Sequence, residues 1–220
     1  MSLTYGKKIN LSFIIQKLPN DKFLIKYYLQ LAKMKALINY LLQYGQLSQV
    51  QIVLVKSKAK KLILTTGKYF SEAGKVAKQV AFVTNGILRV TYYNHEGLEI
   101  TKYFIDENNF AVDLNSYTSK LPSTEYIQAV TDCTLTVFSA DALKDLSLTI
   151  IGWDNIIGKI TEKSLVEKVQ WISPMIGGSA KEKYLNLLER FTQLANRIPL
   201  SMRATYLVTQ SSLSWIRRNI

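Results

Sequence analysis

The spacing of hydrophobic residues changes from helical to alternating and back again along the chain. Between Met34 and Tyr44 apolar residues recur every three or four positions, which predicts an amphipathic helix that ends before Gly45. A second short helix is predicted over 51–55. From position 61 onward apolar and polar residues alternate, which is typical of strands with one buried face.

The alternating region contains several short β-rich runs separated by glycine-containing breaks. The runs cover 61–64, 80–83, 87–93, 100–105 and 134–138. Asn85-Gly86 and His95-Glu96-Gly97 are predicted to form tight hairpin turns, where glycine supplies a positive φ. Even spacing of short strands predicts an antiparallel β-roll or barrel.

Helical spacing returns over 149–172, a stretch of about 24 residues that would span about 36 Å. Its apolar stripe includes Ile150, Trp153, Ile157 and Ile160. A small roll does not need so long a cover, so these residues are expected to contact the same helix of a second chain in a homodimer. The alternative is a helix that packs wholly on its own roll.

A break follows the long helix. Ser173-Pro174 is predicted to end it, and Gly177-Gly178-Ser179 is predicted to give a flexible hinge.

The segment 200–220 is predicted to form two short helices around a break at 208–210. Hydroxyl groups at the start of the second helix and arginines at its end suit a phosphate-lined groove, so the pattern predicts a helix-turn-helix that binds double-stranded DNA. The alternative is a surface helix pair that closes a small helical subdomain. The residues predicted to meet DNA are Arg203, Thr209, Gln210, Ser211, Ser212, Ser214, Trp215, Arg217 and Arg218.

Charge supports this prediction through its distribution. The 220-residue chain has a net charge of +12, and 48% of its residues are hydrophobic, which excludes disorder as its main state. Residues 180–220 contribute +5 and residues 1–33 another +5, whereas the long middle part contributes only +2. Positive charge therefore coincides with the predicted DNA-binding segment.

Several classes of protein are disfavoured by what the sequence lacks. Cys133 is the single cysteine and is interpreted as a buried thiol, so no disulfide, zinc site, iron–sulfur cluster or other cofactor is expected. The single histidine, His95, is interpreted as a solvated turn residue, and no phosphate loop or nucleophile motif indicates an enzyme. No apolar run is long enough for a membrane span and no signal-peptide order is present, so a cytoplasmic protein without a membrane partner is expected.

This order of elements resembles the Crp/Fnr superfamily of bacterial transcription regulators. The most specific pieces are FVTNGILRV at 82–90, interpreted as the central hairpin of the roll, ANRIPL at 195–200, ATYL at 204–207 and SSLSWIRR at 211–218. The resemblance implies an α+β fold with a cyclic-nucleotide-binding-like sensor β-roll (34–148), a long dimerisation helix (149–173), a hinge (174–179) and a winged-helix-type helix-turn-helix (180–220).

Residues 1–33 lie outside the resemblance. They are interpreted as a basic extension of unknown role, which could be an upstream start, a mispredicted start, or an arm for DNA or lipid.

The resemblance places an effector pocket at Val112, Asp113, Leu114, Ser123 and Thr124, and this pocket departs from the family pattern. Members that bind cyclic AMP have Gly-Glu-Leu followed about ten residues later by an arginine that pairs with the phosphate. Here no basic residue lies between Lys120 and the next strand, and Glu125 would add repulsion. The pocket is therefore predicted to be degenerate, with weak or no cyclic-nucleotide binding and an unidentified small-molecule effector or none.

The DNA-reading helix departs from the family as well. Val208 follows Leu207 where many members have glycine, which predicts an altered helix angle. Trp215 stands where many relatives have a guanine-reading arginine, although Gln210 could read adenine. The leading hypothesis is a homodimeric transcription regulator, and the alternative is a degenerate paralogue that acts as a protein-interaction or non-specific DNA-binding module.

Overall fold

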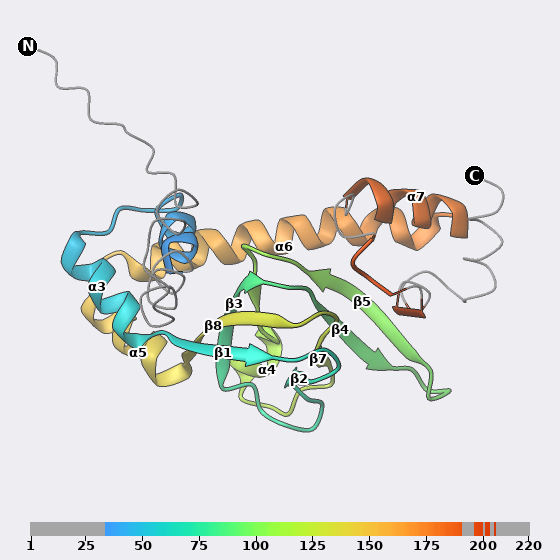
Figure 1. The fold of residues 1–220 in the computed structure, drawn as a ribbon, viewed down its shortest axis with the longest axis horizontal. Helices are drawn as coiled ribbons and strands as arrows, with labels where there is room; N and C mark the ends of the chain where they lie inside the picture. The colour runs from blue at the N-terminus through green and yellow to red at the C-terminus, as the bar shows by residue number, and fades with distance from the viewer. Residues whose placement is uncertain (1–33, 191–195, 200, 203–204, 206–220) are drawn as a thin grey trace, which may run out of the picture.

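A β-roll with a helical layer on one side makes up most of the described chain. The computed structural model describes residues 34–190, 196–199, 201–202 and 205, and these contain two four-stranded antiparallel sheets (Figure 1). One sheet has the order β1-β8-β3-β6 and the other β2-β7-β4-β5. The strands are β1 (Lys60–Leu64), β2 (Tyr69–Ser71), β3 (Gln79–Asn85), β4 (Leu88–Tyr93), β5 (Glu99–Ile105), β6 (Phe110–Ala111), β7 (Tyr126–Ala129) and β8 (Cys133–Ser139).

Helices pack on the outer face of the first of these sheets. A helix over 34–41 confirms the first predicted helix, and α3 (Gln49–Lys58) confirms the second. The others are α4 (Leu114–Ser119), α5 (Ala140–Thr149), α6 (Trp153–Gly177) and α7 (Ala180–Arg190). Helix α6 runs the length of the roll, and α3, α5 and the 34–41 helix gather at one end of it (Figure 1).

Alternation along the strands divides the apolar side chains into two cores. In β3, Ala81 and Val83 belong to an inner core that joins the two sheets, whereas Phe82 belongs to an outer core between β3, β8 and the helices. Successive side chains of a strand point to opposite faces, so one strand supplies both cores. The outer core includes Leu37, Leu41, Phe82, Phe138, Leu146 and Trp153.

The turn at Asn85-Gly86 is not a hairpin, and the prediction of a central hairpin over 82–90 is wrong. Strand β3 pairs with β6 and β8, whereas β4 pairs with β5 and β7, so the chain crosses here from one sheet to the other. Gly86 does have a positive φ of 99°. The signal for a left-handed residue was correct, but it does not specify which strands pair afterwards.

The second predicted turn is confirmed as the hairpin between β4 and β5. The Asn94 side-chain oxygen accepts the amides of Glu96 and Leu98 at 3.0 and 2.9 Å, and Gly97 has a φ of 76°. His95 is exposed in this turn and Cys133 is buried, as predicted for both residues.

The long helix begins and ends later than predicted. Gly152, at a φ of 84°, separates α5 from α6, so α6 starts at Trp153 instead of 149. It continues through Pro174 to Gly177, and α7 starts at Ala180, which leaves a shorter connection than the predicted hinge. A long helix can carry a proline although it loses one backbone hydrogen bond there.

The stripe assigned to a dimer contact packs within its own chain. Ile150 and Trp153 are only 1% and 3% exposed, Ile160 is buried too, and half-buried Ile157 packs against the same outer core. These residues cover the 34–41 helix and the first sheet, as in the alternative interpretation of a helix packed on its own roll. Further along α6, Leu165, Val166 and Val169 remain exposed.

Candidate functional site

Asp113 is the N-cap residue of α4, where the resemblance places a phosphate-binding segment. Its carboxylate accepts the Ser116 amide at 3.0 Å, and the Ser123 hydroxyl lies 2.5 Å from its other oxygen. A carboxylate at a helix N-terminus satisfies free amides that an anionic ligand would otherwise use. The carboxylate of Asp113 therefore occupies an amide at the start of α4.

Ser123 is buried, whereas Thr124 beside it is exposed. The Ser123 hydroxyl accepts the amide of Glu125 at 3.0 Å, and Glu125 forms an ion pair with Lys102 of β5. The charge of Glu125 is thus balanced within the chain, which reduces the repulsion predicted from sequence. Lys102 comes from a distant strand, so inspection of the local motif did not find it.

Lys168 of α6 contacts the roll at Tyr103 of β5. Its ammonium group is 4.7 Å from the centre of the Tyr103 ring, and burial lowers the pKa of Lys168. Burial also raises the pKa of Tyr103, helped by the nearby carboxylates of Glu125 and Asp113. The two side chains occupy the space between α6 and the roll, and neither was predicted from the sequence.

A buried arginine lies within the roll but is already neutralised. Arg89 donates to Gln128 at 2.9 and 2.6 Å and forms an ion pair with Glu99 at 2.8 Å. Arg89 and Gln128 are paired residues on β4 and β7, so their side chains meet across the sheet. This arginine is not available to an anionic effector.

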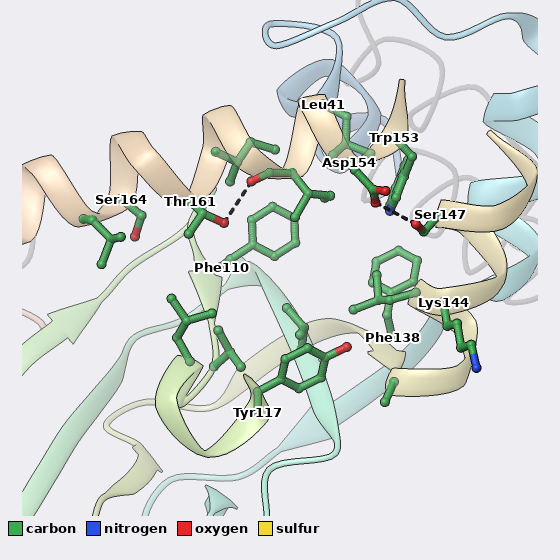
Figure 2. Close-up of a pocket in the computed structure, with 18 of the residues that line it drawn as sticks. Leu41, Phe110, Tyr117, Phe138, Lys144, Ser147, Trp153, Asp154, Thr161 and Ser164 are labelled. Atoms are coloured by element: carbon green, nitrogen blue, oxygen red, sulfur yellow. Dashed lines mark hydrogen bonds between the residues drawn. The ribbon is translucent and has the colours of Figure 1, made fainter. Parts of the chain in front are cut away.

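A cavity of about 530 Å³ lies in the outer core, between α4, α5, α6 and the 34–41 helix. Four aromatic residues line it, and Tyr117 points from α4 toward Phe138 (Figure 2). Burial raises the pKa of Tyr117, with a further contribution from Asp141. The aromatic residues are Phe110, Tyr117, Phe138 and Trp153, and the aliphatic residues include Leu37, Leu41, Val80, Leu143, Ile157, Ile160 and Leu165.

The structure brings two of the five predicted effector-pocket residues together, Asp113 and Ser123, and places the others apart from them. Val112 and Leu114 line the large cavity, whereas Asp113 lines a smaller hollow of about 250 Å³ beside the 70–79 segment. Ser123 and Thr124 line neither. Alternation at the end of β6 sends neighbouring side chains to opposite sides, and this separates the predicted set.

The start of the C-terminal region contacts the roll. Tyr184 of α7 and Ile198 are buried and belong to the inner core, and Met202 packs against it. Arg197 contacts both carboxylate oxygens of Glu107 at 2.6 and 3.1 Å. Burial alone would raise the pKa of Glu107, but hydrogen bonds from Arg197 and the Gly86 amide hold it below its usual value.

A hydroxyl pair joins the same region to β5. The hydroxyl oxygens of Thr101 and Thr205 lie 2.7 Å apart.

The residues predicted to contact DNA lie outside the described residues, namely Arg203, Thr209, Gln210, Ser211, Ser212, Ser214, Trp215, Arg217 and Arg218.

The architecture is a β-roll of the cyclic-nucleotide-binding type, followed by a long helix and a further helix. No family model matches the sequence, and no curated protein matches it. Solved structures do match, and some of them are described as transcriptional regulators.

Three of the similar structures give the extent of the likeness. The c-di-GMP responsive global regulator CLP of Xanthomonas campestris has a TM-score of 0.64 and 13% identity, over 78% of this chain and 91% of that chain. FixK2 of Bradyrhizobium japonicum has a TM-score of 0.62 and 13% identity, over 73% of this chain and 83% of that chain. The catabolite activator protein of Thermus thermophilus has a TM-score of 0.51 and 14% identity, over 80% and 84%.

A further similar structure, with a TM-score of 0.62 and 17% identity, is described as a regulator of the Crp/Fnr family, so the resemblance stated from the sequence is confirmed at the level of fold. In the part of the chain that the structure describes, no helix has both the length and the apolarity that crossing a bilayer requires.

Proposed function

We propose that the protein is a homodimeric, DNA-binding transcription regulator of the Crp/Fnr type whose roll does not bind cyclic nucleotides. The observation that carries this proposal is the shared architecture of roll, long helix and C-terminal helix, which matches solved regulators over most of both chains. Binding to DNA would place the protein in the cytoplasm.

Exposed apolar residues on α6 support a dimer contact at a different place from the one predicted. Val169 is 67% exposed, and Val166 and Leu165 lie three and four residues before it, on adjoining parts of the helix surface. The 34–41 helix and the outer core do not cover these side chains. A second copy of α6 would bury them, as in a two-stranded helix pair.

The phosphate-binding position supports the absence of cyclic-nucleotide binding. Asp113 already accepts the Ser116 amide at the start of α4, and Lys102 of β5 is paired with Glu125. A cyclic phosphate would have to approach a carboxylate without the guanidinium that usually binds it. We expect millimolar cyclic AMP to leave the melting temperature of the protein unchanged.

The charge distribution supports a role at DNA. Residues 180–220 contribute +5 to the net charge, and of the basic residues among them Arg197 is paired with Glu107 in the structure. Lysines and arginines that do not pair within the protein can release counterions from DNA, which makes binding depend on salt.

The decisive experiment is selection of bound duplexes from a random DNA library at two salt concentrations, with the full chain. A regulator of this type enriches a palindrome with half-sites about one helical turn apart. Recovery of unenriched DNA that is lost at the higher salt concentration would contradict operator recognition, and would favour the degenerate paralogue that acts as an interaction module or a non-specific DNA-binding module.

The dimer contact has its own test. Val169→Glu is expected to shift the protein from dimer to monomer in sedimentation velocity experiments, because it places charge at the centre of the α6 contact. Val50→Glu is the matched control, because Val50 is 79% exposed on α3. A Val169→Glu protein that remains dimeric at low micromolar concentration would exclude this face as the contact.

A further inference from the structure

We propose that the outer-core cavity binds an extended aliphatic monocarboxylate, with its hydrocarbon chain along α6 and its carboxylate at Lys168. The proposal goes beyond the proposed regulatory function and does not depend on it, because binding in this cavity can be measured in the absence of DNA.

The cavity has the size and chemistry of a small-molecule site. Its volume of about 530 Å³ falls in the range of roughly 300–1,000 Å³ that ligand sites occupy. Leucine, isoleucine, valine and aromatic side chains form most of its wall, so an apolar ligand would be removed from water there. It is also separate from the inner core, which lies on the opposite face of β3 and β8.

The cavity follows α6 for several turns. Trp153, Ile157, Ile160, Ser164 and Lys168 all line it, at intervals of three or four residues that correspond to one face of the helix. From the first to the last of these positions α6 rises by about 22 Å. A wall of this length suits an extended chain better than a compact ring system.

The two ends of the cavity differ in charge. Asp141 of α5 and Asp154 at the start of α6 line it away from Lys168, and Asp154 accepts the Ser147 hydroxyl at 2.7 Å (Figure 2). At the other end Lys168 is half-buried. An anionic headgroup is therefore repelled from the first end and attracted to the second.

Lys168 has no carboxylate within ion-pair distance among the residues that the structure describes. The nearest acidic groups are engaged elsewhere, since Glu125 pairs with Lys102 and Asp113 caps α4. This partly buried ammonium group lies over the Tyr103 ring and forms no ion pair with the described residues, so a ligand carboxylate would supply a direct counter-charge.

The other lysines of the wall are less suited to this role. Lys120 donates to the Tyr117 carbonyl at 2.6 Å and lies over the ring of that residue. Lys144 is exposed, and its side chain points away from the cavity (Figure 2). Lys144 therefore provides a matched control, because its removal takes away the same charge at the rim without changing the headgroup position.

The experiment is isothermal titration of the full chain, without DNA, with dodecanoate and with 1-dodecanol, both below their aggregation concentrations. We expect one dodecanoate to bind per chain. Lys168→Met should weaken dodecanoate binding by about tenfold or more and leave dodecanol binding within about twofold, because only the carboxylate needs the ammonium group. Lys144→Met should change dodecanoate affinity by less than about threefold.

A cavity-filling variant tests whether the hydrocarbon chain of the ligand lies along α6. Ser164→Trp puts an indole on the cavity-lining face of α6 and should weaken both ligands, with circular dichroism as the check that the fold is retained. The proposal is overturned if native protein binds no dodecanoate, if Lys168→Met and Lys144→Met weaken it equally, or if folded Ser164→Trp protein binds both ligands as tightly as native protein. None of these outcomes bears on DNA binding, so the failure of this proposal and the failure of the proposed regulatory function can be distinguished.

Discussion

Replacement of Gly86 by alanine tests the crossing between the two sheets directly. In a simple hairpin turn the added methyl group would point to solvent. In the structure a Cβ at position 86 would lie 2.6 Å from the Asp132 carbonyl oxygen, 2.6 Å from Cys133 Sγ and 2.8 Å from Cys133 Cα. Cys133 is the first residue of β8 and Asp132 directly precedes it, and β8 is held between β1 and β3.

Two effects add in the Gly86→Ala protein. A left-handed φ costs a non-glycine residue about 1–2 kcal/mol, and forced overpacking costs a further ~1–3 kcal/mol. The free energy of unfolding should therefore fall by about 2–5 kcal/mol when both are summed. Backbone atoms form part of the overlap, so a change of side-chain rotamer cannot relieve it.

Gly97→Ala is the matched control. Gly97 also has a positive φ, of 76°, but a Cβ there meets nothing within 4 Å. Only the conformational cost of about 1–2 kcal/mol is expected. Urea unfolding followed by circular dichroism measures both variants, and equal destabilisation of the two would refute the close packing inferred at Gly86.

Three further predictions concern polar contacts. Arg89→Met leaves Glu99 without its buried partner, so the free energy of unfolding in urea should fall by about 3 kcal/mol, and a change below ~1 kcal/mol would contradict the role assigned to this pair. Because the pKa of Glu107 is lowered, its contact with Arg197 should be fully formed above pH ~4.3 and be lost as pH falls through the lowered value. Nuclear magnetic resonance of the Arg197 side chain should show this loss, and Glu107→Gln should remove the pH dependence. Ser48→Ala removes the N-cap of α3, whose capping box is complete, and should cost about 1 kcal/mol in thermal unfolding, whereas no change in melting temperature would mean that the cap adds nothing.

Local signals that involve a few neighbouring residues were sufficient for several elements. The alternation over 61–64, 80–83, 87–93, 100–105 and 134–138 located β1, β3, β4, β5 and β8. Strands β2, β6 and β7 were missed. The first two have only three and two residues, which is too few to display a period. The β4–β5 hairpin was predictable because its turn chemistry is contained in its own residues.

The site was less predictable, because its members come from distant parts of the chain. Asp113 and Ser123 were found from a family motif, but Lys102 and Lys168 reach the same region from β5 and α6. Their meeting depends on how the strands pair and on where α6 crosses the roll. A pattern confined to neighbouring residues does not contain that information.

The sequence by itself determined the change from helical to alternating spacing and back, the antiparallel roll, the long helix and the uneven charge, because periodicity and composition depend on each residue and its near neighbours. Tertiary structure decided which strands pair across Asn85-Gly86, which side of α6 is buried, and how Val112 and Leu114 come to line a cavity apart from Asp113. These outcomes depend on long-range packing. An apolar stripe specifies only that it must be buried, and the tertiary arrangement selects the surface that buries it.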